Sequence, residues 1–153
     1  MPYQERDAFL DSIDKEHKVL DRIHSLPDEI WKLLDKRQLI ELSNSGIVTI
    51  GSHGHNHYNL GQIEPEYAKF ELERSKDLLE SAIQKKVKYI AYPDGSYNES
   101  VKDMAEKAGY LGQMAVKYKL PEDETDRRIM DRFGISATTT FESNILFLSK
   151  SFK

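Results

Sequence analysis

Three of the chain's five histidines, His53, His55 and His57, stand at alternate positions and form a cluster of potential metal ligands. They follow an apolar stretch, residues 47–50, whose β-branched side chains predict a strand. If the chain turns after Gly51, His53 and His57 are four residues apart and share a face. If it stays extended, all three imidazoles share a face instead. Either way, two or three neutral imidazoles converge just past a strand end, which suits Zn²⁺ or a similar borderline metal ion.

The segments after this cluster alternate between helical and strand-like patterns. Residues 65–85 predict the clearest helix, because an apolar stripe recurs at helical spacing. That stripe consists of Ala68, Leu72, Ser75, Leu79 and Ala82. The other expected elements are strands at 87–92 and 110–116, a turn at 93–96, a helix from Asn98 to Gly109, and further strands around 130–135 and 145–148. Upstream, Asp35 and Gln38 resemble a capping box that opens a helix closed by Gly46.

This alternation is the order of βαβ units with parallel strands, so we predict an α/β fold. The histidines follow one strand and residues 93–97 follow the next, so both groups lie at the carboxyl ends of strands. Barrels and open α/β sheets place their sites at this end. The tight turn at 93–96 also offers backbone N–H groups to an oxyanion.

Composition sets bounds on the function. A length of 153 residues with 39% hydrophobic and 31% charged residues predicts one globular domain. The net charge of −4 gives no support for a nucleic-acid partner, and the absence of cysteine excludes disulfides, thiolate ligands and cysteine nucleophiles. No apolar run is long enough for a membrane span. The N-terminus lacks the features of a signal peptide, so we expect a cytoplasmic protein, or an extracytoplasmic one if the chain is a piece of something longer.

Two stretches together resemble the polysaccharide deacetylases of the NodB-homology type, which include chitin and peptidoglycan deacetylases. Residues 46–57, GIVTIGSHGHNH, are similar to the family's second motif, a strand leading into Gly-Ser-His with another histidine four residues on. Residues 89–98, YIAYPDGSYN, with Lys107-Ala108-Gly109-Tyr110 behind them, are similar to the third motif, which lines the acetate end of the groove. The resemblance runs from about residue 31 to about residue 135.

The resemblance implies a distorted (β/α)₇ barrel, present here in part, that removes N-acetyl groups from a glycan with the help of a divalent metal ion, zinc being expected. It implies that His53 and His57 are metal ligands and that His55 is not. It also implies that Tyr92, Pro93 and Asp94 contact the substrate. On this basis residues 1–30 form a helical N-terminal segment, and residues 31–153 form the C-terminal portion of a deacetylase-like domain.

The chain departs from the family's pattern in several places. No Asp-Asp pair occurs anywhere, so the first motif, which supplies the general base and a third ligand, is missing. Ala91 stands where an arginine is expected, and Asp94 stands where tyrosine is usual. No histidine follows His57, so the family's late catalytic histidine has no counterpart. The catalytic residues are therefore unassigned, and we expect weak or absent hydrolysis by the isolated chain.

Two alternatives remain open. One is a metal hydrolase of the amidohydrolase type that uses His53 and His55 as an H-x-H pair, although that class needs later histidines. The other is a glycan-binding or assembly module without catalytic activity that kept the fold. In addition, a strand at residues 47–50 with an open edge predicts a homo-oligomer, because open edges pair with other chains.

Overall fold

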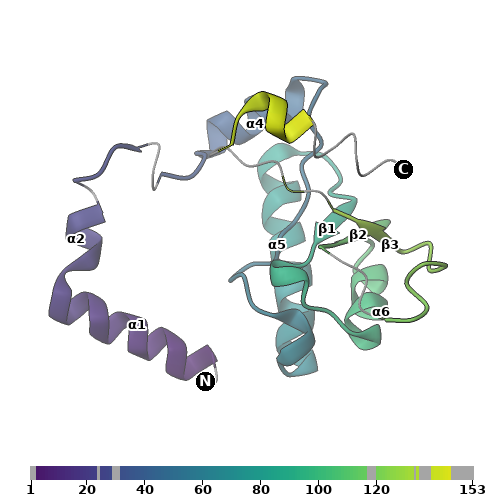
Figure 1. Cartoon of the computed structure of the whole chain (residues 1–153), viewed down its shortest axis with the longest axis horizontal. Helices are drawn as coiled ribbons and strands as arrows, with labels where there is room; N and C mark the ends of the chain where they lie inside the picture. The colour runs from purple at the N-terminus through teal and green to yellow at the C-terminus, as the bar shows by residue number, and fades with distance from the viewer. Residues whose placement is uncertain are drawn as a thin grey trace. The chain divides into compact units, whose positions relative to one another are not determined.

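The computed structural model describes residues 3–23, 25–28, 32–116, 120–132, 134 and 139–145. The chain forms two compact units, residues 1–49 and residues 50–153 (Figure 1). The boundary predicted near residue 30 stays a prediction.

The first unit is helical in its described part. It contains α1 (Tyr3–His17), α2 (Val19–Ile23) and α4 (Lys36–Asn44). The capping box predicted for α4 is confirmed: the Gln38 amide donates to the Asp35 carboxylate at 2.8 Å, and the Asp35 amide donates to the Gln38 side chain at 2.9 Å. These two bonds satisfy backbone donors that the first turn of a helix leaves without partners. Trp31 lies outside the described residues.

The second unit contains the predicted parallel sheet. Its strands are β1 (Tyr89–Ala91), β2 (Gly112–Ala115) and β3 (Ile129–Asp131), and they pair in the order β1-β2-β3. Both pairings are parallel, with Tyr89 opposite Gly112 and Gln113 opposite Ile129. The prediction of an α/β fold with parallel strands is therefore confirmed. The strand expected around residues 130–135 is described only in part, because residues 133 and 135 lie outside the described residues.

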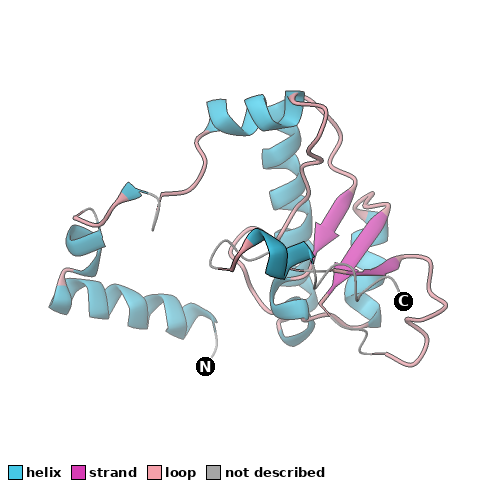
Figure 2. Cartoon of the chain, turned by 45° about the horizontal axis from the view of Figure 1, so that its top comes forward, coloured by secondary structure: helices cyan, strands magenta, loops and turns pink. Residues whose placement is uncertain are grey.

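Two helices accompany the strands, α5 (Pro65–Ile83) and α6 (Glu99–Lys107), and they pack against each other (Figure 2). The predicted stripe on α5 lies inward, with Ala68, Leu72 and Ser75 buried. On α6, Val101 and Ala105 are buried, and the Asn98 side chain caps the first turn by accepting from the Val101 amide at 3.0 Å. Burial of these small and aliphatic side chains against the sheet gives the unit its core. Among the described residues, no helix is long and apolar enough to cross a membrane.

The strand predicted at residues 47–50 is not formed. Instead, one isolated parallel bridge joins Ser52 to Ile90, with the Ser52 amide donating to the Tyr89 carbonyl at 2.8 Å and the Ala91 amide donating to the Ser52 carbonyl at 2.9 Å. Ile47 is 91% exposed. Because β propensity reflects packing on a half-buried surface, an apolar stretch without that packing gains little from an extended ladder.

This correction changes two other expectations. The open edge that suggested a homo-oligomer now belongs to Gly51 and Ser52 beside β1, and the oligomer stays a prediction. The last expected strand, at 145–148, is wrong at its first residue, because Ile145 ends a helical turn formed by residues 141–145. Residues 146–148 lie outside the described part of the chain.

Candidate functional site

The candidate site lies at the carboxyl end of the sheet. Two loops meet there: the histidine loop, residues 53–57, which follows the bridge at Ser52, and the tyrosine loop, residues 92–97, which follows β1. Arg132 follows β3 at the same end, and its amide donates to the Ala115 carbonyl at 2.7 Å. Parallel pairing brings these three chain segments together, as the sequence predicted for the first two.

The histidine loop adopts the turned alternative, in which the first and last histidines share a face. The rings of His53 and His57 have centroids 4.8 Å apart at an interplanar angle of 82°. The ring of His55 turns instead to Phe70 on α5, with centroids 5.8 Å apart. Gly54 at φ +80° and His57 at φ +57° make the turn, since both have left-handed backbone conformations. Two of the three imidazoles therefore converge.

A buried glutamate on α5 holds this turn from below. Glu71 is 1% exposed, and its Oε2 accepts from the backbone amides of His55 at 2.8 Å and Asn56 at 2.7 Å. Its Oε1 accepts from the Asn56 side chain at 2.7 Å. Three hydrogen bonds to one carboxylate satisfy its charge without a cation. Glu71 acts on the backbone of the loop and leaves the histidine rings exposed.

A group of hydroxyls extends this support beneath Gly54. The hydroxyls of Ser52 and Ser75 are 2.7 Å apart, and Ser52 Oγ accepts from the Gly54 amide at 3.2 Å. Tyr110 donates to the Leu72 carbonyl at 2.9 Å and lies 3.4 Å from Ser75 Oγ. Burial raises the pKa of the Tyr110 hydroxyl above its ordinary value, so it stays protonated at neutral pH.

The orientation of His53 is set by a backbone carbonyl. Its Nδ1 lies 2.6 Å from the carbonyl oxygen of Ala91, which can only accept, so Nδ1 carries the proton and Nε2 keeps a lone pair. Partial burial lowers the pKa of His53, the Ala91 carbonyl opposes this, and the positive charge of Arg132 lowers it further. The neutral ring with a lone pair on Nε2 is the form that binds metal ions.

The donor set fits a metal ion in part. Two imidazoles on one face are suitable zinc ligands, with the Ala91 carbonyl in the outer position that often fixes a metal-binding histidine. Within the described ranges, however, no group of three or more His, Cys, Asp or Glu side chains is placed to hold a metal ion. His53 and His57 would supply half of a tetrahedral shell, and their role as ligands stays a prediction.

The tyrosine loop presents one of its three predicted substrate residues. Asp94 is exposed at a φ of +50°, whereas Tyr92 and Pro93 are buried beneath it. The Tyr92 hydroxyl donates to Gln113 Oε1 at 2.5 Å, and burial raises its pKa. From where they lie, Asp94 can face a ligand directly, and the other two form the floor of the loop. Their predicted roles in substrate binding stay predictions.

The expected use of this turn for an oxyanion is limited by its own hydrogen bonds. The Gly95 amide donates to the Tyr92 carbonyl at 3.0 Å, and the Ser96 amide donates to the Pro93 carbonyl at 2.8 Å. The Tyr92 amide donates to the Met114 carbonyl at 3.1 Å. These three donors are therefore occupied by the fold rather than directed at a ligand.

Sequence reasoning missed two residues near the histidines, Glu71 and Arg132. Arg132 had a usable signal, because it follows a strand at the same end of the sheet as the histidines. Glu71 had a weaker one: it precedes Leu72 in the buried stripe of α5 and is three residues after Ala68, so helical spacing puts it beside the inward face.

Comparison with known proteins relates this chain to one family. A family model described as polysaccharide deacetylase matches residues 11–112. The Bacillus subtilis protein YxkH, which its name assigns to the polysaccharide deacetylases, is 36% identical over 83 residues, covering 54% of this chain and 29% of that protein.

Solved structures of deacetylases also align with this chain. The Streptococcus pyogenes deacetylase PplD, in complex with acetate, aligns with a TM-score of 0.61 and 26% identity over 74% of this chain and 50% of that one. A polysaccharide deacetylase from Bacillus cereus aligns with a TM-score of 0.61 and 28% identity over 78% and 37%. This chain spans at most half the length of each of these three relatives.

Proposed function

Because this chain belongs to the polysaccharide deacetylase family, we propose that it serves the metal-dependent removal of N-acetyl groups from a glycan, as the C-terminal portion of a deacetylase domain. The observation that carries the proposal is the convergence of His53 and His57 at the carboxyl end of the sheet, with Asp94 on the neighbouring loop. The substrate class comes from the family and from its relatives' names.

In this proposal the histidine pair holds a divalent ion, for which zinc is the natural choice. A bound ion of this kind polarises an amide carbonyl and lowers the pKa of a water molecule. The chain's own contribution is orientation. The Ala91 carbonyl fixes the ring of His53, and Glu71 fixes the backbone between the two ligands.

The tyrosine loop is proposed to receive the acetyl group. Asp94 projects from the loop beside the histidines and contributes to the electrostatics of His53, where its negative charge favours the protonated ring. The relative PplD binds acetate in its solved structure, which supports an acetyl-sized ligand in this family. Buried Tyr92 and Pro93 provide the floor on which Asp94 stands.

A second candidate is a glycan-binding module without hydrolytic activity. It is favoured by the lack of a third potential ligand beside the histidine pair in the part of the chain that the structure describes. The amidohydrolase-type alternative receives no such support, because His55 turns to Phe70 rather than toward His53.

An acetate-release assay separates these functions. The chain is incubated with N-acetylglucosamine oligomers and zinc, and free acetate is measured. Glycan binding is measured in parallel by the broadening of the glycan's NMR signals. We expect slow, zinc-dependent release, below the ~1 s⁻¹ at the low end of typical enzymes. This release is lost in H53A and H57A and kept in H55A and in H17A, which removes a histidine of α1. Release that persists in H53A and H57A contradicts the proposal, whereas saturable binding without any release supports the second candidate.

A further inference from the structure

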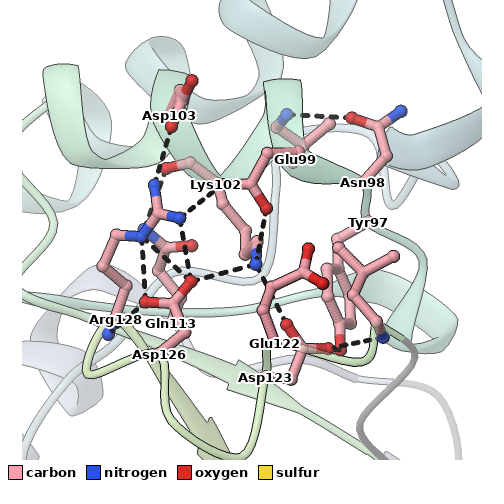
Figure 3. A network of polar contacts seen from close by, with 12 residues as sticks. Tyr97, Asn98, Glu99, Lys102, Asp103, Gln113, Glu122, Asp123, Asp126 and Arg128 are labelled. Atoms are coloured by element: carbon pink, nitrogen blue, oxygen red, sulfur yellow. Dashed lines mark hydrogen bonds and ion pairs between the residues drawn. The ribbon is translucent and has the colours of Figure 1, made fainter.

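A lysine on α6 is enclosed by carboxylates in the interior of the second unit. The side chain of Lys102 is 0% exposed, and its Nζ lies 3.0 Å from Asp123 Oδ1, 2.9 Å from Asp126 Oδ2 and 2.7 Å from Glu99 Oε2 (Figure 3). Burial by itself lowers the pKa of Lys102, but the hydrogen bonds to these three carboxylates outweigh it and hold the pKa above the ordinary value. Lys102 is therefore charged at neutral pH.

Two hydrogen-bonded paths lead from this lysine to the two ends of the tyrosine loop. On one path, the Lys102 carbonyl accepts from Gln113 Nε2 at 2.9 Å, and Gln113 Oε1 accepts from the Tyr92 hydroxyl at 2.5 Å. On the other, Asp123 bonds Lys102 through Oδ1 and accepts from the Tyr97 hydroxyl at 2.6 Å through Oδ2. Tyr97 is thus linked to the buried ammonium group of Lys102, and Tyr92 is linked to the backbone carbonyl of the same residue.

The two tyrosine rings also contact each other. Tyr92 and Tyr97 stack with centroids 5.1 Å apart at an angle of 20°. Stacking of this kind stabilises the pair beyond the burial of the two rings. The four residues 93–96 therefore lie between two tyrosines that are held by other side chains. Tyr92 is bonded to Gln113 and Tyr97 to Asp123, and both of these partners are bonded to Lys102.

The conformation of the loop requires such support. Asp94 has a φ of +50°, which a residue other than glycine adopts at a steric cost. Gly95, at φ +59°, packs so closely on Val116 that an added Cβ would lie 3.2 Å from the Val116 side chain. The first tyrosine also follows Ala91, whose carbonyl orients His53. This hydrogen-bonded network is thus linked to both the exposed carboxylate of Asp94 and the predicted metal ligand His53.

We propose that Lys102, Asp123 and Gln113 are positioning residues that fix the tyrosine loop and so hold Asp94 where a substrate meets it. The part of this inference that concerns substrate rests on the proposed function. The segment 120–128 is part of the device, because it supplies Asp123 and Asp126, and Arg128 joins it to Asp103 on α6 at 2.7 Å. A buried ion pair is an uncertain source of net stability, but it selects one geometry when both partners are satisfied.

Hydrogen exchange of the turn amides tests the positioning role without a substrate. The amides of Gly95 and Ser96 report on the loop, and those in the middle of α5 report on the whole unit. Y97F keeps the stacked ring and removes the hydroxyl that bonds Asp123, while K102M removes the buried charge. We expect each variant to speed exchange at Gly95 and Ser96 by about tenfold or more relative to α5, as local opening does.

The matched control is R128K, which keeps the positive charge and alters the side chain that bonds Glu99, Asp103 and Asp126. It is expected to leave the ratio of loop to α5 exchange unchanged. If Lys102 acts through Tyr97, the double variant K102M/Y97F changes that ratio no more than the stronger single variant. If K102M fails to fold, Y97F decides alone.

The proposal is overturned if Y97F leaves the ratio at the wild-type value, or if R128K changes it as much as Y97F does. The exchange readout is independent of glycan and metal. Failure of the acetate-release assay therefore bears on the proposed function, and an unchanged exchange ratio bears on the positioning residues.

Discussion

The histidine loop and the tyrosine loop lie at the same end of the sheet but are held in opposite ways. The histidine loop is held through its backbone: one buried carboxylate, Glu71, accepts two of its amides and one side-chain amide, and the histidine rings remain exposed. The tyrosine loop is held through the side chains of Tyr92 and Tyr97, which are buried and bonded to Gln113 and Asp123 beside Lys102.

The difference shows which groups remain available for chemistry. Support that acts on backbone amides leaves side chains free for a ligand, as His53 and His57 are placed. Support that acts on side chains removes those side chains from the surface and leaves only what lies between them, here Asp94. A buried carboxylate that accepts from backbone amides and a buried lysine paired with carboxylates therefore support the same end of one sheet.

Loss of the buried charge is expected to have the largest effect. K102M removes the ammonium group that pairs with Asp123 and Asp126, and breaking a buried ion pair from one side costs about 3–5 kcal/mol. The free energy of unfolding from urea denaturation measures this. K107M, which removes an exposed lysine from the same helix, is the control and is expected to cost under about 0.5 kcal/mol. Equal losses in the two variants would show that Lys102 supports nothing specific.

The histidine loop is expected to lose less when its support is weakened. E71Q replaces one acceptor oxygen by a donor that faces N–H groups, and a buried donor left without a partner costs about 1–3 kcal/mol. E73Q, on the exposed face of α5, is the matched control, because its ion pair with Lys69 is exposed and contributes about 0–1 kcal/mol. The two variants are compared by urea denaturation. If E71Q loses no more unfolding free energy than E73Q, the hydrogen bonds of Glu71 do not hold the histidine loop.

Alanine at Gly54 tests the fit of the histidine loop on its support. The left-handed backbone alone costs alanine about 1–2 kcal/mol, and the added Cβ would also lie 3.3 Å from Glu71 Oε2 and 3.4 Å from Pro93 Cγ. Gly46 has nearly the same φ, +77°, with nothing within 4 Å of an added Cβ, so G46A isolates the backbone cost. We expect G54A to lose more unfolding free energy than G46A. A reversed order would mean that the loop moves freely away from Glu71.

Loss of the Arg128 guanidinium is expected to have the smallest effect, seen as a change in acid sensitivity. The Arg128 guanidinium lowers the pKa of Asp126 below 3.8, and Lys102 lowers that of Glu99 below 4.5. Lowered carboxylate pKa values stabilise the fold above these ordinary values, and this stabilisation is lost as the pH falls through the folded-state values. R128M is therefore expected to show a shallower loss of stability below pH ~4 than the wild type. An unchanged acid limb in thermal melts would contradict it.

The sequence predicted what depends on local spacing. The four-residue interval between His53 and His57, with a glycine inside it, was enough to predict that the two rings would meet. The capping box at Asp35 and the parallel strands also followed from nearby residues. The resemblance to the family's second and third motifs located both loops.

What depends on distant partners was not predictable. Residues 47–50 have the composition of a strand, but a strand forms only where a neighbour covers it, and the ladder begins at Ser52. Lys102 reads as a solvated helix residue, because charged side chains are rarely buried. Only the folding of segment 120–128 over α6 encloses it. Both misses share one cause: burial is set by contacts that no local pattern contains.

We propose that His53 and His57, and not His55, form a metal-ligand pair. A zinc titration followed by NMR of the histidine ring nitrogens tests it most directly, with His17 on α1 as an internal reference. The account predicts saturable changes at His53 and His57 together, retained in H55A and lost in H53A and in H57A. Binding that survives H57A but disappears in H55A, or no saturable change at either ring, would contradict it.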